Sequence, residues 1–513
     1  MALKSKLLAG AAVLMLAAPG AAFAKSGDEA RIKALEAQVA DLKAAVEALR
    51  AAQAAPAPVP VATQQDVAAL RTEVQDLKVS TDKSVAALKA DAPTATVTIA
   101  NAKPVIASTD GRFTAAFHGV MQLDTAKYFQ DDHLPTAVTV RDLNGGANFR
   151  RARLGVDGKA FGVFDYNILL DVGGSGAEDA GRIQDLWIQY SGLKPWRFRI
   201  GAFAPSTGLE DSASTNSSLF AERPAVSDLT RGLAGGDTRI GVAAIGNGER
   251  WFFSGAYTGA LVSSLNSGAA AFNAPTFDEQ QGVDLRVAAV PFQGKDWMTH
   301  VGATASVIAQ PADLGPAAAV RYAVQLRERP ELRVDGTRLI DTGAIDTKGL
   351  VAYGLELAVQ KSSLLVQGEY FDINLERRNP AAGASDPSFS GWYVEGGLLL
   401  TGERRRRNIA TAAFDGPTVA KPFDLKKGTW GAWELTARYS TLDLNYAERS
   451  ATVADRVRGG EQDVWALGVN WFPNSAMAFM LDYYQISVDR LNTAGAQIGQ
   501  DVQALNLRSQ FAF

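Results

Sequence analysis

The stretch from Phe149 to Phe203 restricts the possible fold more than any other part of the chain. Within residues 164–172 apolar side chains alternate with mostly polar ones, and the same alternation returns at residues 196–202. A period of two predicts strands with one apolar and one mostly polar face. Short strands joined by alternately short and long links are typical of a transmembrane β-barrel, whose apolar face meets lipid and whose polar face lines the lumen.

The N-terminus predicts export from the cytoplasm. Lys4 and Lys6 precede an apolar run from residue 7 to 18, and Ala22-Phe23-Ala24 has the pattern of a cleavage site. We therefore expect residues 1–24 to be a secretory signal peptide. A membrane anchor is the alternative, but the apolar run is too short to span a bilayer. The absence of cysteine fits an oxidising compartment. The rest of the sequence has no uninterrupted apolar run of spanning length, so a membrane location would require strands.

Residues 25–90 have the pattern of helices with an apolar seam. Steps of three and four residues separate the seam positions, which are Ile32, Leu35, Val39, Leu42, Val46 and Leu49 in one segment and Val67, Leu70, Val74 and Leu77 in the next. A stiff link with Pro56, Pro58 and Pro60 separates the two segments. We predict periplasmic coiled-coil helices over residues 25–90; the alternative is an amphipathic helix lying on another surface. Residues 91–112 show no periodicity and are predicted to be a linker.

Residues 113–513 contain enough alternating segments for a large barrel. We predict sixteen strands, an even number that leaves a water-filled interior. The predicted strands are 113–126, 149–158, 162–172, 182–191, 196–203, 238–245, 250–258, 282–290, 298–308, 350–360, 363–372, 391–401, 430–441, 464–472, 476–488 and 501–513. The predicted fold class is therefore all-β, a 16-stranded antiparallel transmembrane barrel with an N-terminal coiled coil.

One link breaks the alternation of short periplasmic turns and long external loops. Residues 402–429 should form a periplasmic turn, yet the segment is as long as an external loop and strongly basic. A turn of this length could fold into the lumen and narrow it. A solvated periplasmic extension, or an error in the strand count, would explain the length equally well.

Three segments of the sequence resemble the phosphate-selective porin family of Gram-negative outer membranes. They are FRRARLGVDGKAFGVFDYNILLD, RIQDLWIQYSGLKPWRFRIGAFAPSTGLED and KPFDLKKGTWGAWELTARYS, and the resemblance extends over residues 110–513. It implies a homotrimer of sixteen-stranded barrels in the outer membrane, each an anion channel for phosphate. It also implies that the external loop 204–237 and the turn 402–429 fold inward.

An anion channel needs fixed positive charge along its water-filled path. Arginine suits this role because it stays charged and presents planar donors to oxyanions. The strand alternation places a set of arginines on the lumenal face, where charge is much less costly than in lipid. The candidates for anion binding that follow from the alternation are Arg151, Arg153, Arg197, Arg199, Arg239, Arg286 and Arg438, and the resemblance implies an arginine ladder that includes Arg150 or Arg151 of the FRRAR motif. The alternative is that they pair with lumenal carboxylates such as Asp165, Asp284 and Glu434 and only hold the wall together.

The candidates for a constriction come from the two links expected to fold inward. The resemblance implies a lysine in loop 204–237, yet the matching stretch there is Ser214-Thr215-Asn216-Ser217-Ser218. This departure leaves the pore intact but leaves its preference for phosphate open. The candidate residues are Ser217, Ser218, Arg223, Lys421, Lys426 and Lys427. The loop at 309–349 adds arginines that would place positive charge at the mouth, unless it is a solvated loop contacting lipopolysaccharide phosphates.

Catalysis and nucleic-acid binding find little support in the sequence. The three histidines stand in no Ser/His/Asp grouping or metal-ligand spacing, so we predict no catalytic residues, metal or cofactor. The leading interpretation is a porin for small anions, with outer-membrane lipid and lipopolysaccharide as its surroundings. One alternative is a general or organic-anion porin. Another is a structural tether, in which the coiled coil binds peptidoglycan or periplasmic proteins.

Overall fold

The computed structural model describes residues 64–90, 95–100, 102–130, 142–174, 181–233, 237–262 and 280–513. The chain divides into two units, Met1–Ala92 and Pro93–Phe513. The expected signal peptide at residues 1–24 and the first predicted seam helix lie outside the described residues.

In the first unit, the described residues form one helix, α3 (Gln64–Ala90). It contains the second predicted seam, and Val74 and Leu77 are 63% and 56% exposed on its surface. The helix is therefore present, while its association into a coiled coil stays a prediction. No helix in the described part of the chain is long and apolar enough to cross a membrane.

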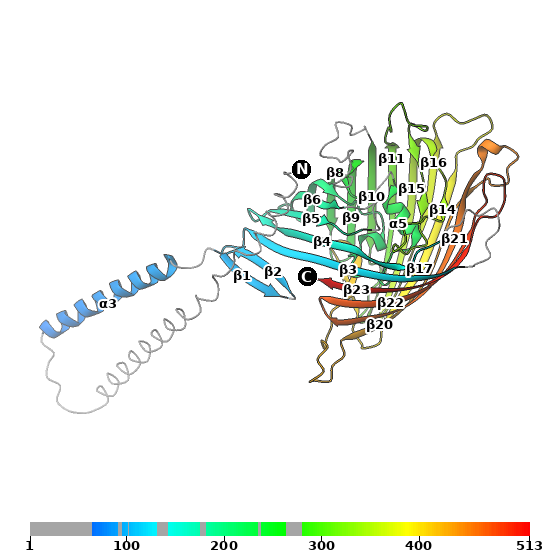
Figure 1. Ribbon diagram of the computed structural model, residues 1–513. Helices are drawn as coiled ribbons and strands as arrows, with labels where there is room; N and C mark the ends of the chain where they lie inside the picture. Colours follow the sequence, from blue (N-terminus) through cyan, green and yellow to red (C-terminus); the bar gives the residue numbers. More distant parts are fainter. Residues whose placement is uncertain are drawn as a thin grey trace, which may run out of the picture. The chain divides into compact units, whose positions relative to one another are not determined.

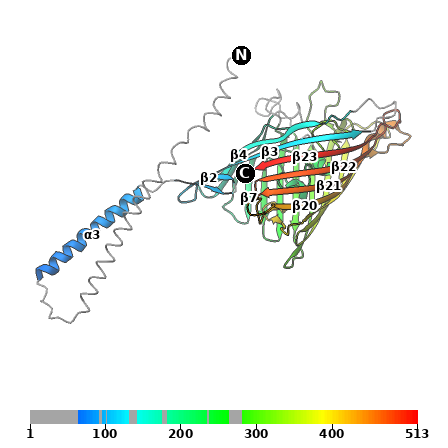
Figure 2. The same cartoon turned by 60° about the horizontal axis from the view of Figure 1, so that its bottom comes forward.

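The second unit is a closed barrel of sixteen antiparallel strands (Figure 1). Each strand is hydrogen-bonded to the next, and β23 returns to β3 in a register that runs from Val502↔Gln130 to Ala512↔Val120 (Figure 2). The wall strands are β3 (Thr114–Gln130), β4 (Gly146–Ala160), β5 (Phe164–Asp171), β6 (Arg182–Tyr190), β7 (Trp196–Phe203), β8 (Arg239–Asn247), β9 (Trp251–Leu261), β10 (Gln281–Ala289), β11 (Trp297–Gln310), β15 (Ile345–Lys361), β16 (Leu364–Arg377), β17 (Ser388–Leu399), β20 (Ala432–Tyr446), β21 (Val457–Asn474), β22 (Met477–Asp489) and β23 (Asp501–Ala512).

The predicted strand set is confirmed, because each of the sixteen predicted segments overlaps one wall strand. The largest difference is at β21, which begins at Val457 rather than at residue 464. The beginning of β21 lacks the apolar alternation on which the prediction depended, because Val457 is followed by Arg458, Gly459 and Gly460. Strand pairing there continues beyond the alternating part of the strand, where no lipid imposes a pattern.

Side chains alternate across the wall as a barrel in lipid requires. On β15, Leu355 and Leu357 point outward and are 64% and 55% exposed, whereas Glu356 between them is 5% exposed. The outward face is apolar along the strands, and the inward face carries most of the buried polar and charged side chains. The sequence period of two therefore translates directly into a lipid face and a lumenal face.

The prediction of a linker over residues 91–112 is wrong for most of that segment. It contains a hairpin of β1 (Ala95–Ala100) and β2 (Lys103–Ser108), and β2 pairs with the start of β3 from Val105↔Ala116 to Ala107↔Thr114. The reason is that β23 ends beside Val120, so the first residues of β3 have a free edge. An unpaired edge of this kind is a ready template for another strand.

Within the described residues, four segments between wall strands carry their own short elements. Residues 204–238 contain α4 (Leu209–Ser212) and α5 (Ala225–Arg231). Residues 311–344 contain β12 (Ala323–Val324), β13 (Arg327–Glu328) and β14 (Ile340–Asp341), and residues 400–431 contain β18 (Arg405–Asn408) and β19 (Ala413–Pro417). A short 3-10 helix, η3 (Val453–Asp455), lies between β20 and β21.

Gly158 allows a close contact between three strands, and its replacement should weaken the wall. A Cβ atom there would lie 1.9 Å from the carbonyl oxygen of Thr114 and 2.7 Å from the hydroxyl of Tyr166. We expect Gly158→Ala to lower the free energy of unfolding by about 1–3 kcal/mol, because the backbone of β3 must move. Heat-modifiability of the folded barrel on gels would measure the loss. The control is Gly146→Ala on the same strand, because a Cβ atom at Gly146 meets no atom within 4 Å. An equal loss of stability in both variants would contradict a special role for the contact at Gly158.

Candidate functional site

The external loop 204–237 crosses the barrel interior and meets the opposite wall. Its central residues Phe220 and Val226 are 1% and 0% exposed. The backbone N–H of Ala221 donates to Asp482 on β22 at 3.0 Å, and Asn470 on β21 donates to the carbonyl of Leu219 at 2.8 Å. Since the loop leaves from β7 and returns to β8, these contacts span the lumen. The inward fold implied by the resemblance is observed.

The first part of the turn 402–429 also folds into the lumen and meets this loop. Arg405 makes a bidentate pair with Glu434, with both N···O distances 2.7 Å, and donates to the carbonyl oxygens of Ser217 and Ser218. From the wall, Arg286 donates to the carbonyls of Thr411 and Ala412 at 2.7 and 2.9 Å. The two predicted constriction serines therefore lie where the loop and the turn come together.

The three lysines of the turn are not brought to this constriction. Lys421, Lys426 and Lys427 follow β19 and are exposed, and Lys427 faces Asp424 at 3.4 Å. The neighbouring Phe423 packs against Trp471, which belongs to the outward face of β21. The structure thus corrects the sequence interpretation: the turn enters the lumen through its residues 405–414, and its lysine-rich part lies at the periplasmic rim.

A second external segment, residues 311–344, folds inward as well, which the sequence interpretation missed. Glu331 is 3% exposed and accepts hydrogen bonds from Arg438 and Ser440 of β20. Leu332 is 1% exposed and belongs to the same apolar cluster as Phe220 and Val226. The signal that could have indicated this was the spacing of leucines at 326, 332 and 339, all of them buried. A solvated mouth loop would not need them.

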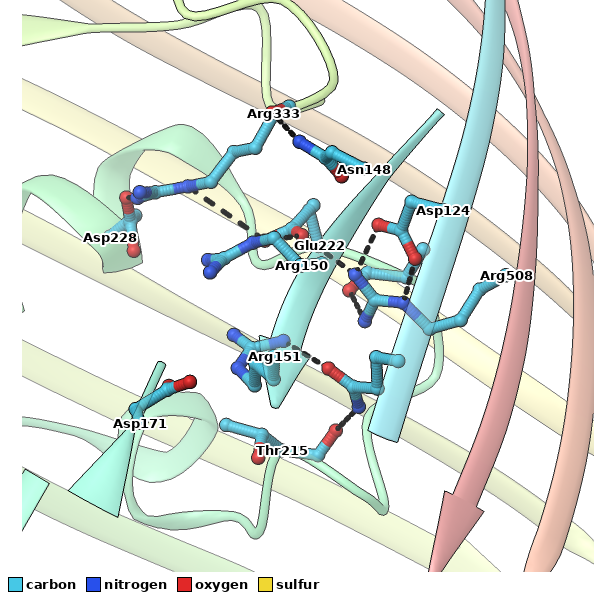
Figure 3. A network of polar contacts seen from close by, with 12 residues as sticks. Asp124, Asn148, Arg150, Arg151, Asp171, Thr215, Glu222, Asp228, Arg333 and Arg508 are labelled. Atoms are coloured by element: carbon cyan, nitrogen blue, oxygen red, sulfur yellow. Dashed lines mark hydrogen bonds and ion pairs between the residues drawn. The ribbon is translucent and has the colours of Figure 1, made fainter. Parts of the chain in front are cut away.

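Glu222 of the inward loop is the centre of a network that fixes the loop to the wall (Figure 3). Arg150 of β4 donates to it through Nε at 2.7 Å and Nη2 at 3.2 Å, and Arg508 of β23 donates at 2.7 Å. Arg508 also makes a bidentate pair with Asp124 of β3, at 2.7 and 2.6 Å. Arg333 pairs with Asp228, and its Nε lies 3.8 Å from a carboxylate oxygen of Glu222. One carboxylate therefore faces three guanidinium groups from three separate segments.

A β-bulge explains why neighbouring arginines both face the lumen. The β3–β4 register passes from Gln122↔Arg151 to Leu123↔Phe149, so Arg150 has no partner residue across the strand pair. The extra residue turns the side chains of Arg150 and Arg151 to the same side, where each is 4% exposed. Arg153 follows at normal alternation and pairs with Asp171 at 2.8 Å.

Arg151 differs from its neighbours in its partners. Its Nη1 donates to the amide oxygen of Gln122 at 2.7 Å, while its buried Nε has no hydrogen-bond partner. Among the described residues no carboxylate lies within ion-pair distance of it. The guanidinium group of Arg151 is therefore a buried positive charge without a paired acid.

The other predicted arginines divide into two groups. Arg239, Arg286 and Arg438 are fully buried and pair with acids, as in the alternative interpretation of a wall held together by ion pairs; their partners are Asp284, Glu356, and Glu331 with Glu395. Arg197 and Arg199 are only partly buried. Arg197 donates to Asn247 and to the carbonyl of Ala410, and Arg199 donates to Gln189 and stacks over Trp187 at 4.1 Å. Arg223 donates to carbonyls of its own loop, at residues 210, 211 and 213.

A cavity of about 420 Å³ lies between β4, the loop 204–237 and the segment 311–344. Nine arginines and three carboxylates are among its lining residues, so arginines outnumber acids on its walls. The arginines are Arg150, Arg151, Arg153, Arg182, Arg231, Arg327, Arg329, Arg333 and Arg338.

Glu328 adds less negative charge to this cavity than an ordinary, fully ionised glutamate would. Burial raises the pKa of Glu328 to about 7, although the neighbouring Arg329 acts in the opposite direction. Near neutral pH this side chain therefore takes up a proton much more readily than an ordinary glutamate. The excess of positive charge on the cavity wall is correspondingly larger.

A closed sixteen-stranded barrel with an apolar exterior, a charged interior and inward-folded loops defines an outer-membrane diffusion channel. Residues 128–513 match the family model described as phosphate-selective porin O and P, and the chain belongs to this family. It is accordingly a porin of the Gram-negative outer membrane, through which solutes diffuse passively.

Two relatives in sequence cover most of the chain. Porin O of Pseudomonas aeruginosa is 26% identical over 432 residues, which covers 80% of this chain and 90% of that protein. An uncharacterised protein of Caulobacter vibrioides is 28% identical over 413 residues, which covers 78% of this chain and 76% of that protein.

Solved structures also align with most of the chain, at low identity. The DcaP channel of Acinetobacter baumannii aligns with a TM-score of 0.43 and 11% identity, covering 79% of this chain and 99% of that one. OprB of Pseudomonas putida aligns with a TM-score of 0.47 and 9% identity, covering 79% and 95%.

Removing the charge of Glu222 should destabilise the inward loop and the wall together. Glu222→Gln leaves Arg150 and Arg508 buried with less compensation, so we expect the free energy of unfolding to fall by about 3 kcal/mol. Denaturant-induced unfolding of the purified barrel would measure it. The control is Glu448→Gln, whose partner Arg449 has a side chain that is 89% exposed and whose loss should change little. Equal stability of the Glu222 variant and the wild type would show that the network does not hold the loop.

Proposed function

We propose that this porin is selective for small anions and that oxyanions, phosphate among them, bind at the cavity beside β4. The observation that carries the proposal is Arg151, a buried guanidinium group on the cavity wall with no paired carboxylate. A buried charge of this kind is costly unless an opposite charge approaches it. An anion in the cavity would supply that charge.

The surroundings of Arg151 favour the same conclusion. Arg150 and Arg153 flank it on the strand, and each already pairs with an acid, Glu222 and Asp171. Their charges are compensated within the protein, whereas that of Arg151 is not. Thr215 of the inward loop contributes a hydroxyl that lies 3.3 Å from Nη1 of Arg153. Guanidinium and hydroxyl donors around a small cavity fit the planar or tetrahedral acceptors of an oxyanion.

The class of oxyanion is the finer part of the proposal. The description of the family names phosphate, which supports phosphate as the solute. The inward loop offers Ser217, Ser218 and Thr215 in place of a lysine, which supports a broader preference that includes organic anions. Phosphate is the first ligand to test, and a carboxylate such as succinate is the second.

Replacing Arg151 should weaken anion binding more than replacing an exposed arginine. We expect Arg151→Gln to weaken the block of chloride current by phosphate at least about tenfold, because a charged hydrogen bond contributes about 1.5–3 kcal/mol. Planar-bilayer recordings of the purified porin would give the blocking constant and the reversal potential in a chloride gradient. Arg321→Gln is the matched control, since Arg321 is 54% exposed in its side chain and pairs with Asp313 in the external segment. A wild-type channel that prefers cations, or that phosphate does not block, would refute the proposal.

We further propose that three copies assemble and that the helix α3 contributes to the contact. Val74 and Leu77 are exposed apolar residues three positions apart, the spacing of one seam position to the next. Helix association would bury them. This proposal concerns assembly and does not depend on the solute.

Charges on this seam should weaken the trimer. Val74→Asp combined with Leu77→Asp should lower the temperature at which the trimer dissociates on a gel run without boiling, because two apolar contacts per helix become charged. Asp76→Asn with Lys78→Gln changes two exposed residues beside the seam and should leave that temperature unchanged. If the trimer is equally stable in both variants, α3 does not contribute to assembly.

A further inference from the structure

The lysine-rich end of the long periplasmic turn forms a structured surface on the outside of the barrel. We refer to residues 421–430 as the periplasmic foot. Two backbone contacts order it: the N–H of Phe423 donates to the carbonyl of Pro473 at 2.7 Å, and within the foot Asp424 pairs with Thr429 as a β-bridge. The foot therefore has a defined shape and a defined position beside the end of β21.

Aromatic contacts place the foot on the lipid side of the wall. The ring of Phe423 lies 5.4 Å from that of Trp471 and 5.8 Å from that of Trp430, and the indole N–H of Trp471 donates to the carbonyl of Trp430 at 2.7 Å. Trp471 is on the outward face of β21, because it follows Leu467 and Val469 in the alternation while Asn470 is buried inward. Aromatic residues at this level mark the boundary between lipid and water.

The foot presents apolar and basic side chains together. Leu425 is 71% exposed, Trp430 is 59% exposed and Phe423 is 37% exposed. Lys421, Lys426 and Lys427 are also exposed, whereas Asp424 is the one acidic residue of the segment. Exposed apolar side chains on a water-soluble turn would be unfavourable, whereas at a membrane boundary they can enter the acyl region while lysines reach the headgroups.

We infer that the periplasmic foot binds an acidic phospholipid of the periplasmic leaflet, with the lysines on the phosphate and Phe423, Leu425 and Trp430 against the acyl chains. The sign of the charge selects an acidic headgroup over a zwitterionic one. The position beside the short-turn end of the barrel selects the inner leaflet, since short turns lie on the periplasmic side. This site is separate from the lumen and does not depend on which anion the channel carries.

The test is lipid binding by the full-length porin in neutral detergent, followed by native mass spectrometry. Phosphatidylglycerol and phosphatidylethanolamine of equal chain length are titrated separately. The first phosphatidylglycerol should bind at least about tenfold more tightly than the first phosphatidylethanolamine, because each lysine near an acidic headgroup contributes a factor of about five. The triple variant Lys421→Gln, Lys426→Gln, Lys427→Gln should remove that difference.

A matched triple variant controls for the loss of charge alone. Lys194→Gln, Lys295→Gln and Lys361→Gln removes three exposed lysines from other short-turn ends and should keep the preference for phosphatidylglycerol. An equal loss in this control would overturn the site, as would equal binding of the two lipids by the wild type. A change from trimer to monomer in the foot variant would show that a second copy covers the surface instead. A changed single-channel conductance would place the lysines in the lumen and would also overturn the inference.

Discussion

Backbone hydrogen bonding in a medium without water is the constraint on which this structure depends. Each wall strand must give all its N–H and C=O groups to neighbours, and only closure of β23 onto β3 leaves no edge in the hydrocarbon. Closure fixes two faces for every strand, and the outer face must be apolar. Charged side chains of the wall can then point only inward, so the chemistry of the channel follows from the requirement that the strands pair.

In the interior the difficulty is repulsion between like charges, because many guanidinium groups share a confined space. Loop 204–237 brings carboxylates among them, and Glu222 alone meets Arg150, Arg333 and Arg508. The turn contributes Arg405 to Glu434 in the same region. On the β4 side the arginines outnumber the acids, and there a cavity lies open. Ion pairing thus supports the loops, whereas Arg151 has no acidic partner among the described residues.

The sequence was sufficient for features that repeat within a few residues. A period of two located all sixteen strands and assigned Arg153, Arg239, Arg286 and Arg438 to the lumenal face. Features that depend on distant segments were not accessible in this way. The inward position of both Arg150 and Arg151 needs a bulge in the pairing with β3, and the inward fold of residues 311–344 needs β20. The lysines of the turn face outward because Phe423 packs against Trp471, which lies about fifty residues later in the chain.

The hairpin β1–β2 has a consequence for the seam where the barrel closes. Phe513 exchanges backbone hydrogen bonds with Gly119, and Val105 of the hairpin already pairs with Ala116, so only Phe117 and His118 separate the two partners along the same edge of β3. The last strand cannot slide toward the beginning of β3 by more than this interval without displacing β2. A longer slip would change the shear of the barrel, and the hairpin limits it to this interval. The hairpin therefore limits the register of the strand pair that closes the barrel.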